Sequence, residues 1–113
     1  MPYIQVNISQ KLSDLQKSAL TTRLGELITL IPGKTDAVTM VDISDGRSIC
    51  KGGHPIDGGF VDLRLFGTTE RPAKEAFTTA VFQAMQELLG IESDKLYLNI
   101  LELDSWGSHG RLK

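Results

Sequence analysis

The feature that most limits how this chain of 113 residues can fold is an order of strand, helix and strand that occurs twice. The first half has an alternating segment, a segment with helical periodicity and a second segment rich in β-formers, at residues 3–8, 13–31 and 37–43. The same order returns at residues 60–66, 70–89 and 96–103. The pattern therefore predicts two successive βαβ units.

The first expected helix has clear signals at both ends. Ser13 is the expected N-cap, and Pro32-Gly33 marks the exit because proline cannot continue helical hydrogen bonding. Between these ends, apolar side chains recur at three- and four-residue spacing, namely Leu15, Ala19, Leu20, Leu24, Leu27 and Ile28. The spacing predicts an amphipathic helix with these side chains on its buried face.

The two halves, residues 2–44 and 60–103, are joined by a glycine-rich connection at residues 44–59. We expect this connection to be a loop with one short hairpin at residues 47–50. Since 113 residues are too few for two hydrophobic cores, we expect a single domain over residues 1–113. Right-handed crossovers then predict a duplicated βαβ fold of the α/β (α+β) class, with a four-stranded mixed sheet and two helices on one face.

One face of this sheet should lie open. Val61, Leu63 and Leu65 alternate with Asp62, Arg64 and Phe66, so that only one set can meet the helices. An uncovered face and free sheet edges favour association between copies. We therefore expect a closed homo-oligomer, in which the tail at residues 104–113 is available to reach a neighbour.

Charge and composition argue against several classes of partner. The net charge of −2 and the absence of a basic run argue against nucleic acid, and no apolar run is long enough to span a membrane. A single cysteine, Cys50, and two histidines, His54 and His109, have no metal-site spacing, so we expect neither a metal nor another cofactor. Without a recognisable signal segment we expect a cytoplasmic protein, with non-classical secretion as the alternative.

Pro2 is the candidate with the most distinctive chemistry. Removal of Met1 would give the chain an N-terminal secondary amine, and an α-amino group has a reference pKa of about 7.7 to 8.0. Burial or a nearby cation would lower the pKa of such an amine, which could then act as a base at neutral pH. If Met1 is retained, the nitrogen is a tertiary amide and cannot do so. The alternative for Met-Pro alone is a disordered terminus.

The sequence resembles the tautomerase superfamily, in particular the branch of macrophage migration inhibitory factor (MIF) and D-dopachrome tautomerase. Four stretches carry the resemblance, which covers nearly the whole chain: residues 1–7 (MPYIQVN), Gly33-Lys34, Leu65-Phe66-Gly67 and residues 90–99 (GIESDKLYLN). The last stretch is the most specific of them. The Cys-x-x-Cys motif of the mammalian factor is absent, so thiol-redox activity is not implied.

The resemblance implies a homotrimer with an active site at each subunit interface. Pro2 would be the catalytic base, Lys34 would bind a substrate carboxylate or oxyanion, and Phe66 would form part of the wall. Tyr97 and Asn99 would come from the neighbouring subunit to orient the substrate. The implied substrate is a small α-keto acid or its enol, and the implied activity is enol-keto tautomerisation of the phenylpyruvate type.

Further candidates beside this site are Tyr3, Arg64 and Trp106. An arginine can clamp a carboxylate through two hydrogen bonds, and related dehalogenases and decarboxylases use arginines beside the N-terminal proline. The alternative for Arg64 is a simple ion pair with Asp62 on the same strand face. Two roles stay open for Trp106, either an anchor at a subunit interface or a lid over the pocket.

Each principal candidate also has a structural alternative. Lys34 can complement the dipole of the preceding helix, Phe66 can be a packing residue, and Tyr97 and Asn99 can lie on a solvated sheet face. Two further functions therefore remain open beside the tautomerase. One is a trimeric signalling or interaction protein with vestigial activity, and the other is a dehalogenase, hydratase or decarboxylase that relies on Arg64.

Overall fold

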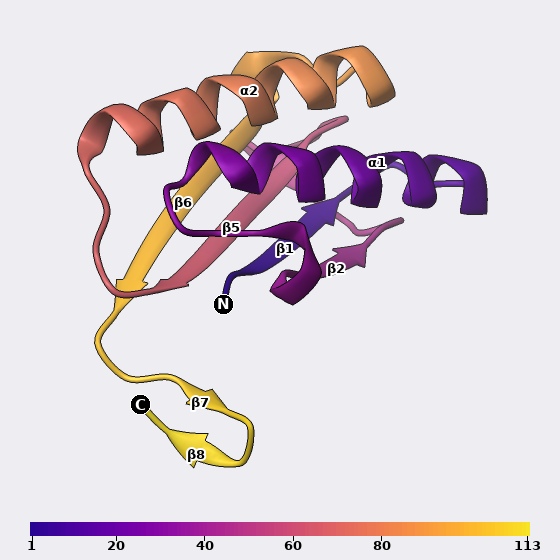
Figure 1. Cartoon of the computed structure of the whole chain (residues 1–113). Coiled ribbons are helices and arrows are strands. Elements are labelled where there is room, and N and C mark those ends of the chain that lie inside the picture. The colour runs from indigo at the N-terminus through magenta and orange to yellow at the C-terminus, as the bar shows by residue number, and fades with distance from the viewer.

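The computed structural model describes all residues from 1 to 113, and its centre is a four-stranded mixed sheet (Figure 1). The sheet has the order β2-β1-β5-β6, with strands at Tyr3–Ile8 (β1), Met40–Ser44 (β2), Gly59–Phe66 (β5) and Leu96–Leu103 (β6). Pairing is parallel within each half, between β1 and β2 and between β5 and β6. The halves join through an antiparallel pair, β1 with β5. The expected duplicated βαβ fold is confirmed.

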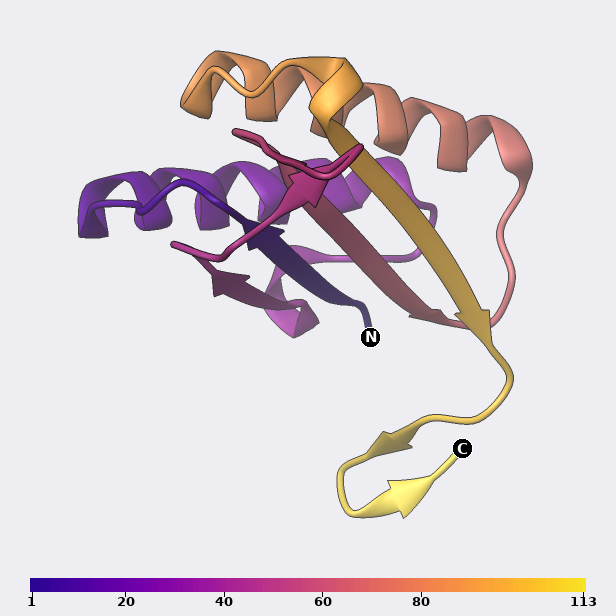
Figure 2. The same ribbon diagram turned by 180° about the vertical axis from the view of Figure 1, so that it is seen from behind.

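Both long helices cover the same face of this sheet (Figures 1 and 2). Helix α1 spans Asp14–Leu27 and continues as a short 3-10 helix, η1, over Ile28–Leu30. Ser13 is its N-cap as predicted, because the Ser13 hydroxyl accepts from the Gln16 amide while the Gln16 side chain accepts from the Ser13 amide. Helix α2 spans Arg71–Leu89 and ends at Gly90, whose φ of +66° is the left-handed conformation typical of such exits.

The core fills the space between the helices and the sheet. Val61, Leu63 and Leu65 of β5 face the helices as predicted, and Phe77 of α2 is the largest side chain that is fully buried there. The prediction for Leu15 was wrong, since its side chain is 81% exposed on the solvent side of α1. Ala19 is exposed too. The first turns of α1 extend past the sheet, so their apolar side chains have nothing to pack against (Figure 1).

Two boundaries in the middle of the chain differ from the prediction. The second strand begins at Met40 rather than at residue 37, because Asp36–Val38 form a short 3-10 helix, η2, that brings the chain back to the sheet. The hairpin in the glycine-rich connection lies at Cys50–Lys51 (β3) and His54–Pro55 (β4), rather than at residues 47–50. Its turn is Gly52-Gly53, and both glycines have positive φ, which a two-residue type I′ turn requires.

The face of the sheet away from the helices is uncovered. Side chains pair across the strands in rows, and one polar row contains Asp42, Gln5, Asp62 and Asn99. Large apolar side chains are also exposed on this face, namely Met40, Phe60, Tyr97, Leu101 and Leu103. A third short 3-10 helix, η3 (Ser93–Lys95), leads into β6. Neither long helix is apolar enough over a sufficient length to cross a membrane.

The tail forms a small hairpin beyond the end of the sheet, away from the helices (Figures 1 and 2). Its strands are Gly107–Ser108 (β7) and Arg111–Leu112 (β8), and backbone hydrogen bonds join Trp106 to Lys113 in both directions. The turn His109-Gly110 has positive φ at both residues. The hairpin therefore carries the end of the chain back toward residue 1, where Lys113 Nζ lies 3.6 Å from Met1 Sδ.

Candidate active site

The N-terminal segment is held firmly rather than frayed. Pro2 is buried, and its carbonyl oxygen accepts a hydrogen bond from the Met40 amide at 3.1 Å. The following residue, Tyr3, already pairs with Met40 on one side and Arg64 on the other. The alternative of a disordered terminus therefore does not hold for this structure.

A hollow of about 370 Å³ lies beside Pro2. Its walls come from the N-terminus, the start of β2 and the C-terminal hairpin, and are formed by Met1, Pro2, Tyr3, Val38, Met40, Trp106, Gly107, Ser108 and His109. Trp106 lines the hollow beside Pro2 within the same chain. Ser108 and His109 also line the hollow and were not predicted as site residues, because no sequence motif marks them.

The electrostatics of this hollow favour a neutral amine. In the structure the terminal amino group belongs to Met1, and its pKa is lowered first by burial and then by the positive charges of Lys34 and Lys113. Both effects disfavour the ammonium form. The charges of Lys34 and Lys113 would act in the same direction on an amine at Pro2. Lys34 is therefore a nearby cation of the kind that favours the neutral form of a terminal amine.

Lys34 and Phe66 meet directly. Lys34 Nζ donates a hydrogen bond to the carbonyl oxygen of Phe66 at 3.1 Å, and both residues are partly buried. Lys34 forms none of the chain's five ion pairs, so no carboxylate compensates its charge. The Phe66 carbonyl therefore holds the ammonium near the N-terminus and leaves its other two N–H donors for an anion.

Tyr3 and Arg64 form a second cluster on the open face of the sheet. The Tyr3 hydroxyl donates to Asp42 Oδ2 at 2.5 Å, and this hydrogen bond is the main reason that the pKa of Tyr3 is raised. The Arg64 guanidinium lies 5.3 Å from the centre of the Tyr3 ring, a cation–π arrangement. Arg64 makes no ion pair with Asp62, so the simple pairing considered from the sequence is absent.

Tyr97 and Asn99 lie elsewhere within the same chain. Through the strand register, Tyr97 is level with Phe60 and Asn7, and Asn99 is level with Asp62 and Gln5. At about 3.3 Å per residue, the five steps from Pro2 to Asn7 separate Tyr97 from Pro2 by about 17 Å along the sheet. Asn99 Nδ2 is directed at Asp62 Oδ1, 3.5 Å away. One chain therefore brings together Pro2, Tyr3, Lys34, Phe66 and Trp106, but not Tyr97 and Asn99.

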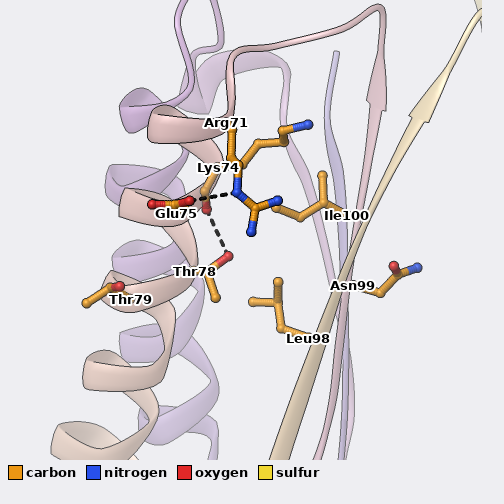
Figure 3. A pocket seen from close by; sticks show the side chains of 8 residues that line it. All are labelled: Arg71, Lys74, Glu75, Thr78, Thr79, Leu98, Asn99 and Ile100. Carbon is orange, nitrogen blue, oxygen red and sulfur yellow. Dashed lines mark hydrogen bonds and ion pairs between the residues drawn. The ribbon is translucent and has the colours of Figure 1, made fainter.

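The largest surface hollow, of about 500 Å³, lies between α2 and β6 (Figure 3). Its charged groups are already compensated, because Arg71 pairs with Glu75 at 2.7 Å and Lys74 pairs with Glu102 at 2.6 Å. Figure 3 shows Leu98 and Ile100 directed toward the helix, whereas Asn99 points away from it. This hollow therefore offers no uncompensated base or nucleophile.

The sequence matches no family model, and no curated protein matches it significantly. Solved structures match over nearly the whole chain. MIF2 from Leishmania major is 21% identical with a TM-score of 0.91, covering 100% of this chain and 97% of that one. Pt0534 inactivated by 2-oxo-3-pentynoate is 18% identical with a TM-score of 0.85, covering 96% and 92%, and a fused 4-OT asymmetric trimer is 18% identical with a TM-score of 0.84, covering 96% and 94%.

These neighbours are MIF homologues and members of the tautomerase superfamily, and the chain has their fold. The resemblance inferred from the sequence is thus confirmed at the level of the fold. At identities near 20% the likeness extends no further, so activity and site roles are argued below from the residues of this chain.

Proposed function

We propose that this chain is an enol-keto tautomerase of the phenylpyruvate type, which uses the secondary amine of Pro2 as its base after Met1 has been removed. The observation that carries the proposal is the environment of the terminal amine. That amine is partly buried beside two cations that lower its pKa. A lowered pKa increases the fraction of unprotonated amine, which is the form that can accept a proton.

The proposed reaction moves one proton within the substrate. From enol to ketone, the Pro2 nitrogen takes the proton from the enol hydroxyl, the C=O bond forms, and the proton passes from nitrogen to the neighbouring carbon. No electron or proton is gained or lost overall. Lys34 would bind the carboxylate of an α-keto acid through the N–H donors not used by the Phe66 carbonyl, and would stabilise charge that develops on the substrate oxygen.

We propose further that the working unit is a homotrimer, in which Tyr97 and Asn99 of one subunit complete the Pro2 site of the next. Two observations support this. Tyr97 is 57% exposed on a face that also exposes other large apolar side chains, and it is too far from Pro2 to serve the same small substrate within one chain. One of the structural neighbours is itself a trimer.

The test is phenylpyruvate turnover by protein whose intact mass proves that Met1 is absent. We expect Pro2→Gly to lower kcat/KM by about 10²- to 10⁴-fold, since a well-placed base contributes that much. Glycine leaves a primary amine of different geometry and basicity but removes little packing, and circular dichroism checks the fold. Equal rates for the wild type and Pro2→Gly would contradict the proposed mechanism.

A further inference from the structure

A separate pocket of about 370 Å³ lies at the opposite end of the sheet from Pro2. It is enclosed by the glycine-rich connection on one side and by β1, β5 and the start of β6 on the other, and Figure 2 shows the connection in magenta beside these strands. The side chains that matter to its chemistry are Asn7, Arg47, Lys51, Phe60 and Tyr97. Of these residues, only Tyr97 was a candidate site residue from the sequence.

The charged residues that line this pocket are all positive. Three of its lining residues are cations, and none is an aspartate or a glutamate, in a chain whose net charge is −2. Lys95 is compensated by Glu92 at 3.3 Å. Arg47 bonds only to the Ser44 hydroxyl, at 3.0 Å, and Lys51 donates only to the carbonyl oxygen of Asp94, at 2.5 Å. Arg47 and Lys51 therefore present two positive charges that no carboxylate neutralises.

The remaining wall suits a flat group. The rings of Phe60 and Tyr97 meet edge to face, with centres 6.4 Å apart and planes at 70°. Lys51 Nζ lies 5.1 Å from the centre of the Tyr97 ring, which places its charge directly beside that aromatic surface. Asn7 Oδ1, which also belongs to this wall, is buried without a hydrogen-bond partner.

We propose that this pocket holds the far end of the substrate, and that Arg47 and Lys51 select substrates whose far end carries a second anionic group. The inference rests on the proposed function, because Tyr97 belongs both to this pocket and to the site that the neighbouring Pro2 would complete. Lys34 binds the α-keto acid carboxylate near Pro2, Tyr97 and Phe60 contact a flat middle portion, and the two cations bind a distal carboxylate. The substrate class is thus a dianionic α-keto acid.

The experiment compares phenylpyruvate with 4-carboxyphenylpyruvate, which adds one carboxylate at the far end of the ring. We expect the wild type to favour the dianion by about tenfold or more in kcat/KM, equivalent to roughly one favourable charged contact. In the double variant Arg47→Ala/Lys51→Ala the ratio of the two kcat/KM values should fall to about one. The matched control is Lys95→Ala, which removes a cation of the same pocket that Glu92 already compensates and should keep the ratio within about twofold.

The outcomes separate this inference from the proposed function. Turnover of phenylpyruvate by the wild type without any preference for the dianion would overturn the inference alone. If neither compound is turned over, the proposed function fails, and calorimetric titration of 4-carboxyphenylpyruvate into the same proteins decides the inference. Binding that weakens at least tenfold in the double variant but not in Lys95→Ala would support the pocket, and equal binding or none would overturn it.

Discussion

At the scale of single residues, the proposed mechanism depends on how the charge of the Lys34 ammonium affects the pKa of the terminal amine. The pKa of the terminal amine is lowered by burial first and by the charge of Lys34 second. Lys34 is in turn held by the carbonyl oxygen of Phe66 rather than by a carboxylate. A carboxylate partner would have cancelled the charge that the amine experiences. The backbone partner positions Lys34 and leaves its charge intact.

Lys34 therefore has two separable effects in the proposed site. In Lys34→Ala, of the two neighbouring charges only that of Lys113 still disfavours the protonated amine, so the pKa of Pro2 rises and the acidic limb of the kcat/KM profile moves to higher pH. The KM for phenylpyruvate should also rise by about tenfold or more because a charged contact is lost. The measurement is the pH–rate profile of Met1-free protein.

Lys34→Arg keeps the charge and provides the control for this prediction, because its acidic limb should stay near that of the wild type. An acidic limb that moves to lower pH in Lys34→Ala, or that does not move, would contradict the electrostatic part of the account.

At the scale of elements, Glu102 of β6 joins the strand to the beginning of α2. Its carboxylate accepts from Lys74 Nζ and from the Thr69 amide, both at 2.6 Å. These two bonds, with the Lys74 bond as the larger cause, lower the pKa of Glu102 below its usual value of 4.5. While it is ionised, the Glu102 carboxylate therefore links β6 to the beginning of α2.

Glu102→Gln should destabilise the fold in a way that depends on pH. Because the folded-state pKa is lowered, the wild-type carboxylate contributes stability above about pH 4.5, and that contribution is lost as the pH falls through the lowered value. Urea unfolding at fixed protein concentration should show a less stable variant at neutral pH and a smaller difference in acid. A difference that is the same at both pH values would show that the charge is not responsible.

Elements with strong periodicity were predictable from the sequence, and those set by distant contacts were not. Strands 3–8 and 96–103 agree with β1 and β6 in both bounds, because their side chains alternate between a buried and an open face. Leu15 has the right spacing for the buried face, yet the sequence does not show that α1 extends past the sheet at that point. The Gly52-Gly53 pair is itself a turn signal, and the hairpin predicted at residues 47–50 lies too early in the chain because it does not use this pair as its turn.

At the scale of the whole molecule, the candidate site is divided between two ends of one sheet. Pro2, Lys34 and Trp106, each named as a candidate from the sequence, lie at or near one end, where the N-terminus, the exit of α1 and the tail come together. At the other end the sequence indicated Tyr97, but not the cations of the pocket there. There Lys51 meets Tyr97, a contact between segments far apart in the chain that depends on how the glycine-rich connection folds back.

This division leads to the measurement that tests the central claim most directly. Chains with Pro2→Gly are co-expressed with chains carrying Tyr97→Ala and Asn99→Ala, and the phenylpyruvate tautomerase activity of the mixed assemblies is compared with that of each variant alone. If the site joins Pro2 of one subunit to Tyr97 and Asn99 of the next, mixed trimers contain complete sites and their activity exceeds the sum of the two separate variants several-fold. Activity no greater than that sum, in assemblies shown by mass to contain both chains, would contradict it.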